Sequence, residues 1–238
     1  FPADTWTNGE IVVCDRGAIA RTAKGQNVLA GGAGGYVLAN AEANGDGLSG
    51  DDHYLPAVHI TYDDGVVLKA WLATVNNHVA TITGSTLIED DADGDIMADF
   101  SSRGANRALP DMVGPSISAP GVDILAAYGI DDAVEWGMIS GTSMASPHVA
   151  GAAALLIAIH PEWSPAEVQS AMMLTSWMDV LDDDGVTPAT PFAMGNGRVD
   201  LNVAAEAGFV MDETIANYEN ANPADGGDPK TLNLPSMG

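Results

Sequence analysis

One stretch of the sequence constrains the fold more than any other, the run from Ser143 to His160. Its residues have helical spacing, and the resulting helix would be apolar on almost every side. Such a helix is stable only where other elements cover it, which predicts a position in the middle of a larger domain. Its most apolar part, Val149 to Ile159, contains Gly151 and is shorter than a membrane span requires. Pro161 predicts the end of the helix.

The first third of the sequence alternates between strand-like and helix-like segments. Short apolar or β-branched runs bounded by Gly, Asp or Asn are typical of strands, and the runs between them have helix-compatible spacing. The expected strands are Glu10–Cys14, Gly35–Asn40, Ala57–Tyr62 and Val79–Leu87, and the expected helices are Ile19–Ala30 and Val66–Val75. This alternation predicts a small α/β domain over residues 1–86.

A second part of different character follows the acidic run Glu89–Asp95. Ser164-Pro165-Ala166-Glu167 predicts a helix start, because Ser suits the N-cap, Pro the first position and Glu a capping box. The other expected elements are a strand at Ile117–Ala127 broken by Pro120-Gly121, the helix Ser143–His160, and a helix at Val199–Ala207. We therefore expect residues 87–212 to form the later part of a larger α/β domain, and the Asn-, Asp- and Pro-rich residues 213–238 to form a linker.

The charge balance of the chain excludes two classes of partner. Eight Lys and Arg residues stand against 33 Asp and Glu residues, which gives a formal net charge of -25. Nucleic acids and anionic membranes need a positive face, so neither is expected as a partner. Cys14 is the only cysteine, so the chain forms no internal disulfide and its redox compartment stays open. The chain starts at Phe1 without a signal sequence, and we expect it to be a segment of a longer protein.

The chemistry of the sequence concentrates in GTSMASPHVAG, residues 141–151. A serine at a helix N-terminus lies in a positive potential beside free backbone N–H groups, which stabilise the oxyanion of an acyl-transfer intermediate. Gly141 leaves room for a substrate backbone, and Pro147 is tolerated in the first turn. Spacing alone leaves two interpretations of Ser143 open, a nucleophile or an N-cap before a buried helix.

The extended motif GTSMASPHVAGAAALL resembles the serine motif of subtilisin-like proteases, the subtilases. SAPGVDI (residues 118–124), FSSRG (100–104) and HPEWSPAEVQSAMMLTS (160–176) resemble further segments of the same family. The resemblance implies a secreted serine endopeptidase that hydrolyses protein or peptide substrates through an acyl-enzyme on Ser143. It also implies that the backbone N–H of Ser143 is one oxyanion donor.

The partners that a nucleophilic serine needs are missing from the sequence. Such a serine requires a histidine base oriented by an acid. The family carries its aspartate before Thr/Ser-Gly and its histidine before Gly, but Asp4-Thr5 precedes Trp6 and no histidine here precedes glycine. We expect the Asp, His and oxyanion Asn in the upstream half of the same polypeptide, and the chain alone to be inactive. His148 is expected to pack inside the domain.

The first domain resembles the protease-associated (PA) domain inserted in many subtilases. The resemblance is carried by GEIVVCDRG (residues 9–17), AGGAGGYVLAN (30–40) and LPAVHITYDDG (55–65). That domain is not catalytic, and the resemblance implies gating of substrates or contacts with other proteins. The final DPKTLNLPS (228–236) resembles the entry into a fibronectin-type-III-like domain. A non-catalytic interaction module with a degenerate protease remnant is the alternative interpretation.

Two acidic runs raise the question of a metal. Asp91–Asp95 and Asp182–Gly185 resemble fragments of calcium loops, but the first has Ser102 where an EF-hand needs a bidentate Glu. Solvated acidic loops are favoured over structural calcium, and no cofactor is expected to be required. Cys14 is interpreted as a small apolar residue of the first strand, with Arg16 as the basic neighbour that a reactive thiol would need.

Overall fold

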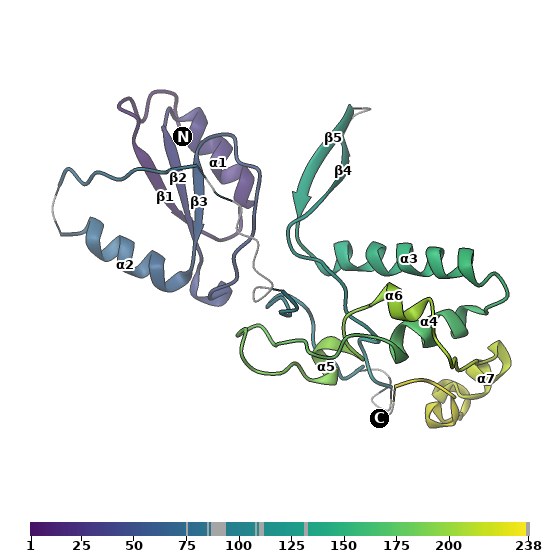
Figure 1. Cartoon of the computed structure of the whole chain (residues 1–238). Helices are drawn as coiled ribbons and strands as arrows, with labels where there is room; N and C mark the ends of the chain where they lie inside the picture. The colour runs from purple at the N-terminus through teal and green to yellow at the C-terminus, as the bar shows by residue number, and fades with distance from the viewer. Residues whose placement is uncertain are drawn as a thin grey trace. The chain divides into compact units, whose positions relative to one another are not determined.

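The structure is a computed structural model that describes residues 1–74, 76–84, 86, 94–107, 109, 112–130 and 133–236. The chain divides into two compact units (Figure 1). The first contains Phe1–Ile88 and Val122–Ser140, and the second contains Glu89–Gly121 and Gly141–Gly238. Helices and strands are mixed along the chain, which confirms the α/β class expected from the sequence.

The first unit is built on a three-stranded parallel sheet in the order β1-β2-β3. The strands are β1 (Ile11–Asp15), β2 (Gly35–Ala39) and β3 (Ala57–Ile60). Ile11 pairs with Gly35 in the first ladder, and Tyr36 pairs with Ala57 in the second. The central strand β2 is buried at every position, as its short apolar sequence predicts for a strand covered on both faces.

Two helices cover opposite faces of this sheet. Alternate side chains of a strand point to opposite faces. On one face, Tyr36 of β2 belongs to the same buried cluster as Val28 of α1 (Arg21–Ala30). On the other face, Ala39 of β2 lies against α2 (Tyr62–Leu72), and a Cβ on Gly65 would lie 2.8 Å from the Cβ of Ala39. Gly65 therefore lets α2 approach the sheet closely. Three of the four expected strands and both expected helices are present near their expected positions.

A buried polar cluster at the end of β2 holds the long loop that follows it. Asn40 is fully buried, and its Nδ2 donates to the carbonyls of Gly45 at 3.0 Å and Gly47 at 2.8 Å. Its Oδ1 lies 2.8 Å from Nε2 of His59, so that nitrogen carries the hydrogen and donates. Nδ1 of His59 then accepts from the backbone N–H of Ser49 at 3.1 Å. These bonds satisfy the buried amide and fix the loop.

A two-stranded antiparallel hairpin also belongs to the first unit. It consists of β4 (Ile124–Ile130) and β5 (Ala133–Ile139), with Ile124 paired to Ile139. The ends of the hairpin are joined by Asp123 and Ser140, because the Ser140 hydroxyl donates to the Asp123 carboxylate at 2.8 Å. The backbone N–H of Gly50 donates to the same carboxylate at 3.0 Å.

The second unit packs its helices around a small apolar core. Its main helices are α3 (Thr142–Ile159) and α4 (Pro165–Leu174), and its short helices are α5 (Pro191–Met194), α6 (Leu201–Ala204) and α7 (Ile215–Asn220). The buried cluster contains Ala152 and Leu156 of α3, Val168 and Met172 of α4, and Ala204 of α6. Ser164 and Glu167 form the capping box that the sequence predicts for α4.

Among the described residues, the buried side chains of α3 lie on one side of the helix. Leu156 is 0% exposed, whereas Leu155 is 57% exposed and Ile159 is also 57% exposed. The expected burial on all sides is therefore wrong for this chain, because the described elements cover one face only. With 18 residues and a mean hydropathy of 1.4, α3 also has the length and composition of a membrane span, contrary to the expectation from sequence. The core helix of a soluble protein meets the same criterion.

The segment that begins at Asp212 is structured and bonded to the rest of its unit. The hydroxyl of Ser164 donates to the Asp212 carboxylate at 2.6 Å, and Glu213 accepts from the backbone N–H of Asn233 at 2.6 Å. That last bond is the main reason that the pKa of Glu213 is lowered, and Asn217 and Thr214 add further donors. The segment contains α7 and the short 3-10 helices Pro223–Asp225 and Pro229–Thr231, which its composition does not suggest.

Several element boundaries differ from the sequence expectation. Helix α2 begins at Tyr62 rather than Val66, because the Thr61 side chain accepts the N–H of Asp64 and caps the helix. Within the expected strand Val79–Leu87, residues 79–84 and 86 form no strand, and its other residues lie outside the described part. The expected strand Ile117–Ala127 is reduced to a bridge at Ser118 followed by β4, and the expected helix Val199–Ala207 is reduced to α6.

The two adjacent leucines of α3 provide a stability test. We expect Leu156→Ala to lower the free energy of unfolding of the second unit by about 2–5 kcal/mol, because it opens a cavity in the core. Leu155→Ala removes an exposed side chain and is expected to change it by about 0.5 kcal/mol or less. Urea denaturation of the two variants measures both values. Equal losses would show that the buried face of α3 is wrongly assigned.

The histidines of the first unit make its stability depend on pH. Burial is the main cause that lowers the pKa of His59, and the guanidinium groups of Arg16 and Arg21 lower it further. The Ser49 carbonyl and the Asp51 carboxylate act in the opposite direction and raise it. Burial also lowers the pKa of His53. At about pH 7.5 and above, histidine is mostly neutral in folded and unfolded chains alike. Below that pH the unfolded chain binds protons first, so the free energy of unfolding is expected to fall.

The matched variant for this pH dependence is His59→Gln. Glutamine can still donate to Asn40 but does not titrate, so the variant should lose less stability between about pH 7.5 and pH 5.5 than the unchanged chain. Urea denaturation at the two pH values, compared as a difference within each protein, provides the measurement. An equal loss in both proteins would contradict a role of His59 in the acid sensitivity.

Candidate active site around Ser143

Ser143 lies in the first turn of α3 and is exposed to solvent. The carbonyl of Gly141 accepts from the backbone N–H groups of Met144 at 2.9 Å and Ala145 at 3.4 Å, so the helical pattern begins there. The backbone N–H groups of Thr142 and Ser143 donate no hydrogen bond to any described residue. The helix start therefore presents a hydroxyl beside N–H groups that have no partner among the described residues.

No side chain caps this helix start. Gly141 is the N-cap residue, and it has no side-chain acceptor for the N–H groups of the first turn. Pro147 lies in the second turn rather than the first, and it has no N–H to donate to the carbonyl of Ser143. Both polar groups of the Ser143 backbone are thus left without the partners that a regular capped helix would supply. Of these two groups, the free N–H is the one suited to binding a carbonyl oxygen that gains negative charge.

Among the described residues, no histidine hydrogen-bonds to Ser143. His148 is exposed, and its Nδ1 donates to the carbonyl of Met144 at 2.9 Å, one turn earlier in α3. The expectation that His148 packs inside the domain is therefore wrong for this chain, because it lies on the face of α3 that the described elements leave open. His160 stacks on Trp163 with ring centroids 3.9 Å apart and donates from Nε2 to the carbonyl of Ala205 at 2.8 Å.

The remaining histidines have structural contacts in the first unit. His59 holds the loop at Asn40, His53 lies edge-on to Tyr36 with ring centroids 5.2 Å apart, and His78 lies against Trp71. Each is engaged with an aromatic ring or an amide rather than with a nucleophile. The described part of the chain therefore places an exposed serine hydroxyl beside free backbone N–H groups, but no histidine that could act as a general base for it.

The acidic runs that resemble calcium loops take part in ion pairs and turns. Asp95 binds Arg198, and Asp182 accepts from Arg103 at 2.5 Å. Asp184 is fully exposed, and its pKa is lowered mainly by the hydroxyl of Thr187, followed by backbone N–H groups of that turn. Within the described residues, no group of three or more His, Cys, Asp or Glu side chains is arranged to hold a metal ion, and residues 91–93 of the first run lie outside that part.

Cys14 is half-buried and packs against the core of the first unit. Burial raises the pKa of its thiol, and the charged neighbour that opposes this is Lys24 rather than the expected Arg16. A thiol with a raised pKa is a poor nucleophile at neutral pH. The interpretation of Cys14 as a packing residue agrees with this environment.

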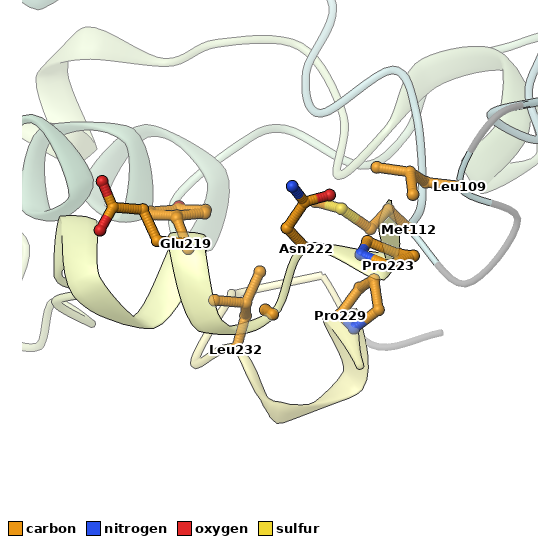
Figure 2. Close-up of a pocket in the computed structure, with 9 residues that line it drawn as sticks. Leu109, Met112, Glu219, Asn222, Pro223, Pro229 and Leu232 are labelled. Atoms are coloured by element: carbon orange, nitrogen blue, oxygen red, sulfur yellow. The ribbon is translucent and has the colours of Figure 1, made fainter. Parts of the chain in front are cut away.

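A shallow apolar hollow of about 360 Å³ lies in the second unit, apart from the residues of α3 (Figure 2). Leu109 and Met112 line one side, and Leu232 and Pro229 lie across from them. The amide of Asn222 at its rim already binds Asp225 and the backbone N–H of Ala224. The hollow therefore offers mainly apolar surface, with Glu219 and Asn222 among its polar lining residues.

The sequence does not reveal Gly121 as part of the site. The carbonyl of Gly121 accepts from the backbone N–H of Gly141 at 2.7 Å, so this residue touches the turn that carries Ser143. From the sequence, Pro120-Gly121 is only a break in a strand. Since no local pattern indicates a contact between residues about twenty positions apart, only the fold reveals it.

The fold and the site together define a class: an α/β protein with an exposed serine beside free amides at the start of an apolar helix, an arrangement suited to acyl transfer. The family model described as Subtilase family matches residues 16–197. The chain belongs to the subtilase family, which confirms the resemblance seen in the serine motif.

The chain is similar to plant subtilisin-like proteases along most of its length. It is 39% identical to subtilisin-like protease SBT1.6 of Arabidopsis thaliana, over 95% of this chain and 32% of that protein. It is 40% identical to SBT1.7 of the same plant, over 88% of this chain and 30% of that protein. The chain thus spans about a third of the length of the curated relatives it matches.

A solved structure is also similar to part of the chain. The crystal structure of the psychrophilic subtilisin-like protease Apa1 from the Antarctic psychrotroph Pseudoalteromonas sp. AS-11 aligns with 82% of this chain and 34% of that chain. The sequence identity is 18% and the TM-score is 0.30.

Proposed function

We propose that the chain is the nucleophile-bearing part of a secreted serine endopeptidase that cleaves protein or peptide substrates. The observation that carries the proposal is the start of α3, where the exposed Ser143 hydroxyl adjoins N–H groups without partners among the described residues. Membership of the subtilase family and similarity to proteins named as proteases support the same reaction class. Attack by the hydroxyl on a peptide carbonyl would form an acyl-enzyme, with the Ser143 N–H binding the oxyanion.

The histidine, the aspartate and the oxyanion asparagine belong, in this proposal, to the upstream half of the same polypeptide. The support is the set of contacts that occupy the histidines of the described residues, together with the greater length of the relatives. A substrate-facing serine without a base is activated only weakly, so the upstream half is a necessary partner. No cofactor takes part in this reaction scheme.

Residues 1–86 form, in this proposal, a PA domain that acts in substrate access or protein contacts rather than in catalysis. The support is the resemblance of its glycine-rich segments together with its own parallel sheet and core. Residues 87–212 would be the later part of the catalytic domain, and residues 213–238 would lead toward a fibronectin-type-III-like domain. A non-catalytic interaction module remains the second candidate, favoured by the absence of a base near Ser143 among the described residues.

The chain by itself is expected to lack enzymatic peptide hydrolysis. The reason is the missing base, because losing a member of a catalytic triad lowers turnover by about 10⁴-fold or more. Purified chain would be incubated with casein and with chromogenic peptides, and Ser143→Ala serves as the matched control for contaminating protease. Activity that Ser143→Ala abolishes would contradict the prediction, because one of the five histidines would then act as the base.

In the full-length protein, a serine-directed phosphonate is expected to label Ser143 and not Ser146. Both side chains are exposed, so exposure does not separate them. The difference is that Ser143 adjoins the free N–H groups of the first turn, whereas the N–H of Ser146 lies inside the helical pattern. Mass spectrometry of the labelled peptide provides the measurement.

The variants Ser143→Ala and Ser146→Ala complete this test. Label should disappear in Ser143→Ala and persist in Ser146→Ala. Label that survives in Ser143→Ala would identify a different nucleophile. A folded full-length protein that takes no label at all would favour the non-catalytic interaction module.

A further inference from the structure

Two backbone segments of the second unit touch without any side chain between them. Gly121 precedes the hairpin in the sequence, and Gly141 is the N-cap residue of α3. The N–H of Gly141 donates to the carbonyl of Gly121 at 2.7 Å. A Cβ atom on Gly121 would lie 2.8 Å from the carbonyl oxygen of Gly141 and 3.2 Å from the Cβ of Ala145. The first of these distances is shorter than unbonded carbon and oxygen atoms tolerate, so the backbone would have to move.

The two glycines differ in what requires them. A Cβ on Gly141 would meet nothing closer than 3.6 Å, at the sulfur of Met144, and its φ of 162° is extended backbone that other residues adopt. Gly121 has no left-handed φ either, so space and not conformation excludes a larger residue there. The close packing behind the serine turn thus depends on Gly121 more than on the glycine inside the GTS motif.

Displacement at this contact would reach the reacting groups directly. The Gly141 oxygen that a side chain on Gly121 would strike is the acceptor for the N–H groups of Met144 and Ala145. Moving that oxygen moves the start of the helical pattern, and with it the N–H and side chain of Ser143. A displacement of about 1 Å in a catalytic group lowers turnover by about 100-fold.

We infer that Gly121 is a positioning residue for Ser143, whose missing side chain sets where the nucleophile and its oxyanion donor lie. The inference rests on the proposed function, since it assigns a role within the same site. Gly121 itself touches no substrate and acts through the Gly141 turn.

The test uses the full-length protein with Gly121→Ala and, as matched control, Gly208→Ala. Gly208 is exposed, and a Cβ added to it would meet no atom within 4 Å, so its substitution should leave kcat unchanged. Active sites are counted from the acyl-enzyme burst, and kcat is expressed per counted site. We expect Gly121→Ala to lower kcat per site between about tenfold and 100-fold, with KM changed by less than about threefold.

If Gly121 has a purely structural role, Gly121→Ala will lower the number of active sites but leave kcat per site unchanged. That result would overturn the inference. Ala145→Val approaches the same contact from the helix and keeps the test decisive if Gly121→Ala does not fold; it should also lower kcat per site. Unchanged kcat per site in the folded variant would overturn the inference. Full activity in Ser143→Ala would overturn the proposed function and this inference together. If Ser143→Ala is inactive but Gly121→Ala has an unchanged kcat per site, the inference alone is overturned.

Discussion

The packing of α3 on α4 is the interaction on which the serine site depends. Leu156 and Ala152 are buried against Val168 and Met172, and this contact fixes the rotation and position of α3. Burial of a leucine side chain contributes about 2 kcal/mol to stability, so these few buried side chains provide most of the free energy that holds α3 in place. Because Ser143 lies in the first turn of the same helix, its position follows from contacts made several turns further along.

Hydrogen bonds of two serine side chains in turn hold α4 in place. The Ser164 hydroxyl accepts the N–H of Glu167 and donates to the Asp212 carboxylate, so one side chain joins the helix start to the C-terminal segment. The Ser170 hydroxyl, almost fully buried in α4, accepts the N–H of Met211 at 2.8 Å. Met211 and Asp212 therefore buttress α4, and through α4 they buttress the helix that carries the serine.

The sequence predicts elements well where local patterns decide them and poorly where distant contacts do. The capping box at Ser164 and the apolar run of α3 are local, and the structure confirms both predictions. Hairpin β4–β5 does not follow from the sequence, because its strands are fixed by pairing with each other and by the bond between Asp123 and Ser140. Helix α7 does not follow either, because the polar composition around it hides the Thr214 cap.

In the candidate site, too, the sequence predicts what local patterns decide and misses what distant contacts decide. The serine motif locates Ser143 and its helix start from the sequence alone, because the hydroxyl and the free N–H groups of this proposed site belong to one turn. The one-sided burial of α3, and with it the exposure of His148, depends on which elements cover the helix, which periodicity does not reveal. Gly121 escapes sequence analysis for the same reason, since its role is a contact between backbones far apart in sequence.

The helices of the chain differ in whether a side chain caps their N-terminus, and this difference explains why a glycine suits the serine turn. Side chains cap α2, α4, α6 and α7. Helices α1, α3 and α5 have no side-chain cap, and α3 is the one of these three that starts at a glycine. A Ser or Asp cap in place of a residue without one stabilises a helix by about 1 kcal/mol. Its oxygen would, however, accept the N–H groups of the first turn, which the proposed reaction needs free for the substrate oxyanion. The uncapped start thus gives up stability to leave donors free, and the backbone contact with Gly121 supplies part of the order that a cap would otherwise provide.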